Sequence, residues 1–262
     1  MNLLKEYSLK QAEDAVYWLN KYVKANEEEA LHQYRVHIKK TRSVISFFEQ
    51  QQLHEKKIKK LKKQLRNIFH SAGFIRECEL HIQWLRKNRY SLLLQEASLE
   101  QKLPLYKQTF LDKTKKYRDL MYKTGVSLAA FCSEVDKKSV FDYAVKLKQS
   151  ITLSVRSVNK EDWHELRKSV KQLLYAYNWQ SENEKIKLLT VNELAYFDQL
   201  QEAIGNWHDA EALKTWLGNE QFFLSSDMRV KNQFKRCWEK LLQETNGKEI
   251  IIRQLLKRHR SV

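Results

Sequence analysis

The clearest pattern with chemical potential is a run of histidine, arginine and lysine residues at helical spacing. The segment His32-x-x-Arg35-x-x-x-Lys39-x-x-Arg42 places one such residue every three or four positions. Residues three and four apart lie on the same face of an α-helix, so these side chains are expected to form one stripe. Like charges stacked along a helix cost about 0.2–0.5 kcal/mol per pair. A stripe without compensating carboxylates therefore indicates a site for an anion.

The pattern occurs again 132 residues further along the chain, where His164, Arg167 and Lys171 repeat its first three positions. The same shift, without a gap, pairs other residues of equal type, which are Gly73 with Gly205, Glu79 with Glu211, Trp84 with Trp216 and Leu85 with Leu217. Agreement of a polar motif, a glycine and a Trp-Leu pair at one shift is improbable by chance. We therefore expect one domain, 1–262, built from two repeated halves of roughly 1–131 and 132–262.

The basic stripe borders an apolar stripe on the same helix. Their centres lie about 110° apart, whereas a face that only promotes solubility would lie on the far side of the helix. The apolar stripe consists of Leu31, Tyr34, Ile38, Thr41 and Ile45 in the first half, and of Trp163, Leu166, Val170, Leu173 and Tyr177 in the second. The cations are therefore expected at the edge of the core.

The elements that position these residues are expected to be helices. Five glycines and one proline in 262 residues argue against a β-sandwich or barrel, which needs a breaker every ~8–12 residues. Apolar residues recur at helical spacing almost throughout, which predicts an all-α fold of two pseudo-symmetric helical bundles. The expected helices cover 8–24, 28–49, 55–71, 75–89, 104–123, 137–156, 161–179, 187–204, 208–218, 227–245 and 248–259. The expected breaks include Gly73, Pro104, Gly125, Gly205, Gly218 and Gly247.

The charge balance points to a polyanionic partner. Forty-eight basic and 32 acidic residues give a net charge of +16, and a polyanion would relieve the resulting self-repulsion. Residues 1–131 hold 26 basic and 14 acidic residues, a net charge of +12, which leaves +4 for the second half. Cys78, Cys132 and Cys237 are far apart and are expected as small core residues in a reducing compartment. No apolar run approaches the ~20 residues of a membrane span, so we expect a soluble, cytoplasmic protein.

A lysine-rich segment adds further candidates. Seven basic residues lie within positions 56–66, around the apolar line of Ile58, Leu61 and Leu65. A solvated surface helix and direct contact with an anion are both open for this segment. Lys59, Lys63 and Arg66 are accordingly included among the candidate binding residues.

The motifs resemble the CHAD family, the conserved-histidine α-helical domain. ALHQYRVHIKKTR and, more loosely, DWHELRKSVKQLLY are similar to the His-bearing helices of that family. SAGFIRECEL and AIGNWHDAEAL look like its Gly-x-x-Arg-Asp and Leu-Gly-x-x-x-Asp segments, so the resemblance covers nearly the whole chain. It implies two pseudo-symmetric helical bundles that bind inorganic polyphosphate. Family members are often found with polyphosphate granules or attached to triphosphate-processing domains, so polyphosphate-associated proteins and a granule location are implied as well.

The resemblance also assigns residues. By motif position, it implies a binding surface formed by His32, Arg35, Lys39, Lys40, Arg42, His164, Arg167 and Lys171, to which we add Arg76 from SAGFIRECEL. Leu174 stands where another basic residue is usual, and Glu77 replaces the usual Asp after Arg76. The second half also lacks the lysine cluster. We therefore expect the first half to contribute more to a basic groove lined by the two repeated helices.

Polyphosphate suits these side chains because it is a linear chain of charges without bases. Arginine offers a planar fork for two phosphate oxygens, and lysine acts as a mobile point charge. Histidine can donate a hydrogen bond when neutral and becomes a cation if the anion raises its pKa. Affinity is expected to fall steeply with salt, by analogy with nucleic-acid binding.

Two other functional classes stay open. A nucleic-acid-binding protein would use the same charge excess, although the sequence has no recognisable reader motif. A hydrolase or transferase acting on phosphorylated substrates would need carboxylate pairs for metal ions, which do not occur at helical spacing. The sequence also has no phosphate-binding glycine loop and no His-x-x-x-His or Cys-x-x-Cys metal motif. We expect a non-enzymatic protein without a metal or cofactor.

Overall fold

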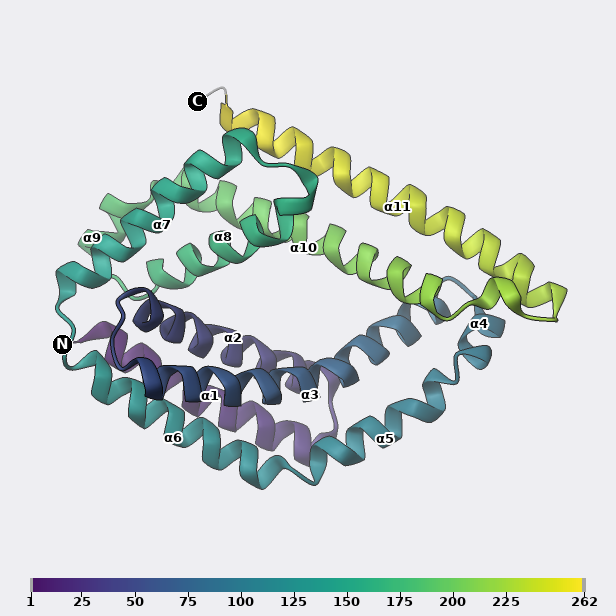
Figure 1. The fold of residues 1–262 in the computed structure, drawn as a ribbon, viewed down its shortest axis with the longest axis horizontal. Coiled ribbons are helices and arrows are strands. Elements are labelled where there is room, and N and C mark those ends of the chain that lie inside the picture. Colours follow the sequence, from purple (N-terminus) through teal and green to yellow (C-terminus); the bar gives the residue numbers. More distant parts are fainter. Residues whose placement is uncertain (1, 261–262) are drawn as a thin grey trace. The chain divides into compact units, whose positions relative to one another are not determined.

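The computed structural model describes residues 2–260, which are helical and contain no strand (Figure 1). The all-α prediction is therefore confirmed. The α-helices are α1 (Leu3–Ala25), α2 (Glu28–Gln50), α3 (Glu55–Lys87), α4 (Ser91–Glu96), α5 (Leu99–Leu111), α6 (Thr114–Cys132), α7 (Lys137–Ser157), α8 (Trp163–Tyr177), α9 (Glu182–Leu188), α10 (Val191–Asn219) and α11 (Met228–Arg260). Two short 3₁₀ helices are η1 (Lys160–Asp162) and η2 (Phe222–Leu224).

The chain forms two compact units, and α3 and α7 each continue from one unit into the other. Unit 1 holds residues 1–82, 99–143 and 179–181, and unit 2 holds residues 83–98, 144–178 and 182–262. The first histidine stripe and its α3 partners fall in unit 1. The second stripe and its α10 partners fall in unit 2.

In unit 1, α1 packs along both α2 and α6 (Figure 1). Gly125 of α6 permits this close approach, because a Cβ atom there would lie 2.5 Å from the Cβ of Ala12. α5 contributes Phe110 to the core, where its ring lies 5.8 Å from that of Tyr22 and 6.2 Å from that of Tyr34. These three side chains are fully buried, so aromatic packing joins α1, α2 and α5.

In unit 2, α10 packs along both α8 and α11. A capping box opens α10: the Thr190 side chain accepts from the Glu193 backbone N–H at 3.2 Å, and the Glu193 carboxylate accepts from the Thr190 N–H at 2.9 Å. Trp163 of α8 is buried and packs edge-to-face on Trp207 of α10, with 5.1 Å between the ring centroids. This contact fixes α8 against α10 beside the second stripe.

The predicted apolar stripes face these cores. All five first-half positions are buried, and so are the second-half positions except Tyr177, which is half-buried. Cys78, Cys132 and Cys237 are buried and free, as expected for small core residues. None of the described helices is long and apolar enough to cross a membrane.

The expected helix breaks at glycine are wrong. All five glycines lie inside helices, and the described glycines have no positive φ. The expected pairs 55–71 with 75–89, 187–204 with 208–218 and 227–245 with 248–259 are therefore parts of α3, α10 and α11. Pro104 lies within α5, and the expected helix 104–123 is interrupted between α5 and α6. Residues other than glycine adopt the left-handed conformation, namely Asn26, Gln52, His54, Arg89, Ser98 and Gln221.

A buried ion pair ties α3 to α5 in unit 1. The Glu79 side chain is 1% exposed, and its Oε1 lies 3.0 Å from the Nζ of Lys107. Burial raises the pKa of Glu79, and Lys107 opposes that rise. Because a charged partner left alone in the interior is costly, the two residues are expected to depend on each other.

Replacing Lys107 by methionine is expected to lower the free energy of unfolding by about 3 kcal/mol, since the Glu79 carboxylate would lose its cation. The double variant E79L/K107M should recover most of that loss, because an apolar pair leaves no buried charge. Urea denaturation measures both. A loss below about 1 kcal/mol in K107M would show that the pair is not important for stability.

Candidate anion-binding site

The first strip consists of His32, Arg35, Lys39 and Arg42, which lie along α2 on the side that meets α3. All four side chains are half-buried. Three of their charged groups lie over one ring: the Arg35 Cζ is 4.2 Å, the Lys39 Nζ 5.5 Å and the Arg42 Cζ 5.3 Å from the centroid of Phe69. The predicted stripe therefore exists, and an aromatic face from α3 lies beneath it.

Arg35 is fixed against α3 by two further contacts. Its Nη1 donates to the backbone carbonyl of Phe69 at 3.0 Å. A Cβ atom on Gly73 would lie 2.7 Å from the same Nη1. Gly73 is therefore required in the middle of α3 because the guanidinium occupies the space that a side chain would take.

The same contacts recur in unit 2. The Nε of Arg167 donates to the carbonyl of Gln201 at 3.2 Å, and a Cβ on Gly205 would lie 2.9 Å from the Arg167 Nη2. Each arginine, each carbonyl and each glycine is displaced by 132 residues from its counterpart in unit 1. Both halves thus use one device, an arginine packed across a helix at a glycine.

Histidine lies at the end of each strip next to another cation. Burial, followed by Arg76, lowers the pKa of His32. The ring of His164 stacks on His208 with 4.5 Å between centroids, and burial, followed by His208, lowers the pKa of His164. Arg76 and His208 are themselves 132 residues apart, so the neighbour of the histidine is a fixed cation in unit 1 and a titratable ring in unit 2.

Two of the α3 candidates lie beside the first strip. Arg66 is exposed and close enough to Arg42 to lower the pKa of the Arg42 guanidinium, although burial is the larger cause. Arg76 lies beside His32, and its Nη1 is 3.6 Å from a carboxylate oxygen of Glu28. Both guanidinium groups therefore extend the positive surface onto α3.

The remaining first-half candidates lie apart from the strip or in solvent. Lys40 faces α1, where burial lowers its pKa and Asp14 opposes that effect. Lys59 is exposed and pairs with Glu55 at 3.4 Å. Lys63 is exposed and has no ion pair within residues 2–260. The geometry therefore groups Arg66 and Arg76 with the stripe, but not Lys40 or Lys59.

The second strip consists of His164, Arg167 and Lys171 on α8, with His208 contributed by α10. Burial and then Arg167 lower the pKa of Lys171, while Asp198 and Asp209 oppose that effect. Leu174 supplies no charge where unit 1 has Arg42. The second strip therefore has fewer cations and closer carboxylates, consistent with the expected imbalance between the halves.

Two side chains of the sites were not singled out by sequence reasoning, Phe69 and His208. The 132-residue shift could have revealed His208, since it superposes this residue on Arg76. Phe69 has no such signal, because an aromatic residue beside an apolar stripe is usually part of the core. Gly73 and Gly205 were noticed, but as helix breaks. Glu77 and Asp209, expected at helix starts, lie inside α3 and α10.

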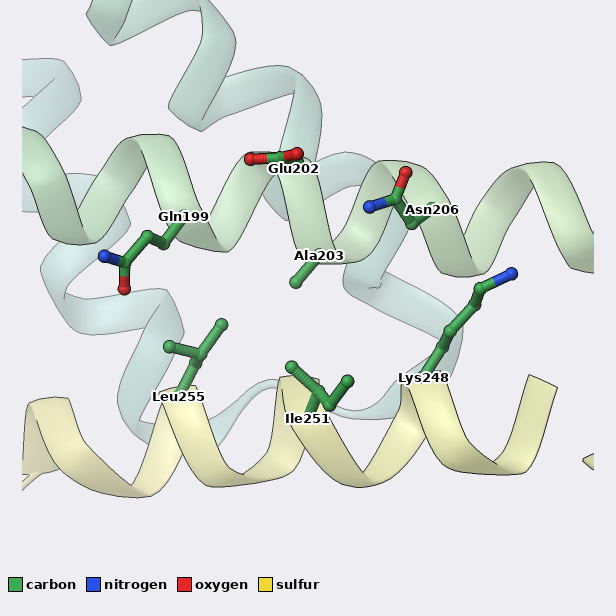
Figure 2. A pocket seen from close by; sticks show the side chains of 7 residues that line it. All are labelled: Gln199, Glu202, Ala203, Asn206, Lys248, Ile251 and Leu255. Atoms are coloured by element: carbon green, nitrogen blue, oxygen red, sulfur yellow. The ribbon is translucent and has the colours of Figure 1, made fainter. Parts of the chain in front are cut away.

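Other hollows are poor candidates for an anion. Figure 2 shows one of about 380 Å³ between α10 and α11, lined by Gln199, Glu202, Ala203, Asn206, Lys248, Ile251 and Leu255. Its one cation is offset by a carboxylate. A second hollow of about 490 Å³ between α1 and α6 combines Arg118 with Glu13 and Asp119. Among the residues described, no three histidine, cysteine or acidic side chains are grouped in a way that could hold a metal ion.

The fold and the two strips define an all-helical protein with paired cationic sites, and the comparisons give its family. The CHAD domain model matches residues 6–218, so the chain belongs to the CHAD family. Among solved structures, PptA from Streptomyces chartreusis is similar, with a TM-score of 0.71 and 13% sequence identity over 97% of this chain and 98% of that one. That likeness shows a shared fold. The curated proteins include no match.

Substituting Gly73 by alanine is expected to weaken polyphosphate binding about tenfold while leaving α3 as stable as before or more so. The new Cβ displaces the Arg35 guanidinium, whereas alanine is favoured over glycine in helices by about 1 kcal/mol. G247A is the matched control, because nothing lies within 4 Å of a Cβ there. Titration with labelled polyphosphate and thermal unfolding of all three proteins test this. Unchanged affinity in G73A would show that the position of Arg35 is unimportant.

The free protein is expected to lose stability as the pH falls below about 6.5. The pKa values of His32 and His164 are lowered in the fold, and those of His37 and His81 fall to about 4. The unfolded chain therefore takes up these protons first, near pH 6.5, and the stability contributed by neutral histidine is lost as the pH drops through the folded-state values.

Thermal unfolding between pH 7.5 and 5 measures this dependence. The variant H32Q/H164Q should show a shallower decline, because two of the four groups no longer titrate. An equal decline in both proteins would contradict the assignment to the strip histidines.

Proposed function

We propose that this protein binds inorganic polyphosphate, without chemical turnover, along the two strips. The observation that carries the proposal is the repeated packing of Arg35 and Arg167 at a glycine, which holds a cation at the edge of each core. Membership of the CHAD family fits a polyphosphate-associated role. The finer claim, direct binding through these residues, rests on the geometry of the strips.

The first strip suits a linear polyanion. From His32 to Arg42 it extends over ten residues, or about 15 Å at 1.5 Å per residue. Arg35, Lys39 and Arg42 provide cations along this length, and Arg66 and Arg76 add guanidinium groups from α3 at either end. Successive phosphate groups could therefore meet successive cations without the need for an enclosed pocket.

The recurrence of contacts at one shift also supports an internal duplication of two helical bundles. Three kinds of contact partner coincide: the arginine, the carbonyl that it reaches and the glycine that it crosses. A chance match of sequence would not preserve the contacts as well. We propose that each half evolved from one polyphosphate-binding unit and that the first half retained more cations. In the cell, we place the protein in the cytoplasm with polyphosphate granules and their associated proteins.

The substitutions R35A and R167A are expected to lower polyphosphate affinity, because hydrogen bonds to charged groups contribute about 1.5–3 kcal/mol. This corresponds to a loss of about tenfold or more for each, with the larger effect from R35A. R229A is the control, since it removes the same charge from a residue that is paired with Asp227 outside the strips. Titrations with long-chain polyphosphate at two salt concentrations, combined with circular dichroism, provide the measurement.

Binding that does not weaken with salt, or that survives in R35A/R167A, would contradict the proposal. Equal displacement of polyphosphate by RNA would favour a general nucleic-acid-binding protein. Release of phosphate in the presence of Mg²⁺ would favour an enzyme. The wild-type and double-variant proteins should be compared in all three assays.

A further inference from the structure

Phe69 is the shared contact of the cations in the first strip. The charged ends of Arg35, Lys39 and Arg42 lie within 5.5 Å of its ring centroid. These residues are three, four and seven apart on α2, and their mutual repulsion would tend to spread them. A cation over an aromatic face gains about 0.5–1 kcal/mol at an exposed site and about 2 kcal/mol when desolvated. One ring can therefore offset the repulsion within the row.

An aromatic partner has a different consequence from a carboxylate partner. A carboxylate would neutralise a guanidinium and occupy the N–H groups at its edge. A ring lies against the flat face, so that most of the edge donors stay available to a phosphate. Arg42 illustrates this, because it contacts the Phe69 ring and forms no ion pair within the described chain. The strip can thus be held in place before its ligand arrives.

Unit 2 lacks this arrangement. The position equivalent to Phe69 is Gln201, and the position equivalent to Arg42 is Leu174. Arg167 still reaches the backbone carbonyl of Gln201, so the arginine packing persists without the ring. The two strips therefore differ in whether an aromatic face organises their cations.

We infer that Phe69 is a positioning residue for polyphosphate, whose ring holds Arg35, Lys39 and Arg42 in one row and makes the first strip the tighter of the two. The inference rests on the proposed function, since it concerns the same ligand. It goes further in assigning affinity to a side chain that carries no charge. Preorganisation of the cations lowers the cost of ordering them on binding.

The test replaces Phe69 by leucine, which keeps an apolar side chain but removes the aromatic face. F69L is expected to weaken binding of long-chain polyphosphate about tenfold, while F69Y, which keeps the ring, should bind within about twofold of wild type. F74L is the matched control on the same helix, because Phe74 is exposed and outside the strip. Thermal unfolding checks that each variant is folded at the temperature of the titration.

A double-mutant cycle separates positioning from general stability. If Phe69 acts by holding Arg42, the losses in F69L and R42A should be less than additive in the double variant. Additive losses, or equal binding by F69L and wild type, would overturn the inference while leaving polyphosphate binding intact. Absence of binding by wild type would instead overturn the proposed function. If F69L is unfolded, F69M replaces it in the same cycle, with the same outcomes.

Discussion

The packing of an arginine across a helix at a glycine is the constraint on which the rest of the site depends. A guanidinium placed at the rim of a core must satisfy its donors without giving up its charge. Arg35 does this with the carbonyl of Phe69, and Arg167 with the carbonyl of Gln201. Both contacts require the helix surface to be open, which is the physical reason for Gly73 and Gly205. The helices α3 and α10 can then continue past the site without interruption.

From this starting point the two units diverge in chemistry. In unit 1 the arginine belongs to a row of cations over Phe69, with fixed charges from Arg66 and Arg76 nearby. In unit 2 the stacked rings of His164 and His208 and the neighbouring Asp198 and Asp209 reduce the permanent positive charge. Duplicated scaffolds can therefore retain the same packing and still differ in their affinity for anions and in their response to pH.

The sequence allowed the helices of the strips and their orientation to be predicted, because hydrophobic periodicity fixes which face of α2 and α8 is buried. It failed where one residue type has two physical uses. Glycine is typical of turns, yet Gly73 and Gly125 serve close contacts inside helices, while Asn26 and Arg89 form turns at positive φ. Phe69 could not be distinguished from a core residue because its role depends on partners in another helix. The groove shared by the two repeated helices stays a sequence-based prediction.

A crystal structure of the full chain with a short polyphosphate at low salt is the most direct measurement. Phosphate oxygens are expected within hydrogen-bond distance of the guanidinium edges of Arg35 and Arg42, and at Arg167 with lower occupancy. Phosphates found only on the exposed lysines of 56–63, with both arginine sites empty, would contradict the account.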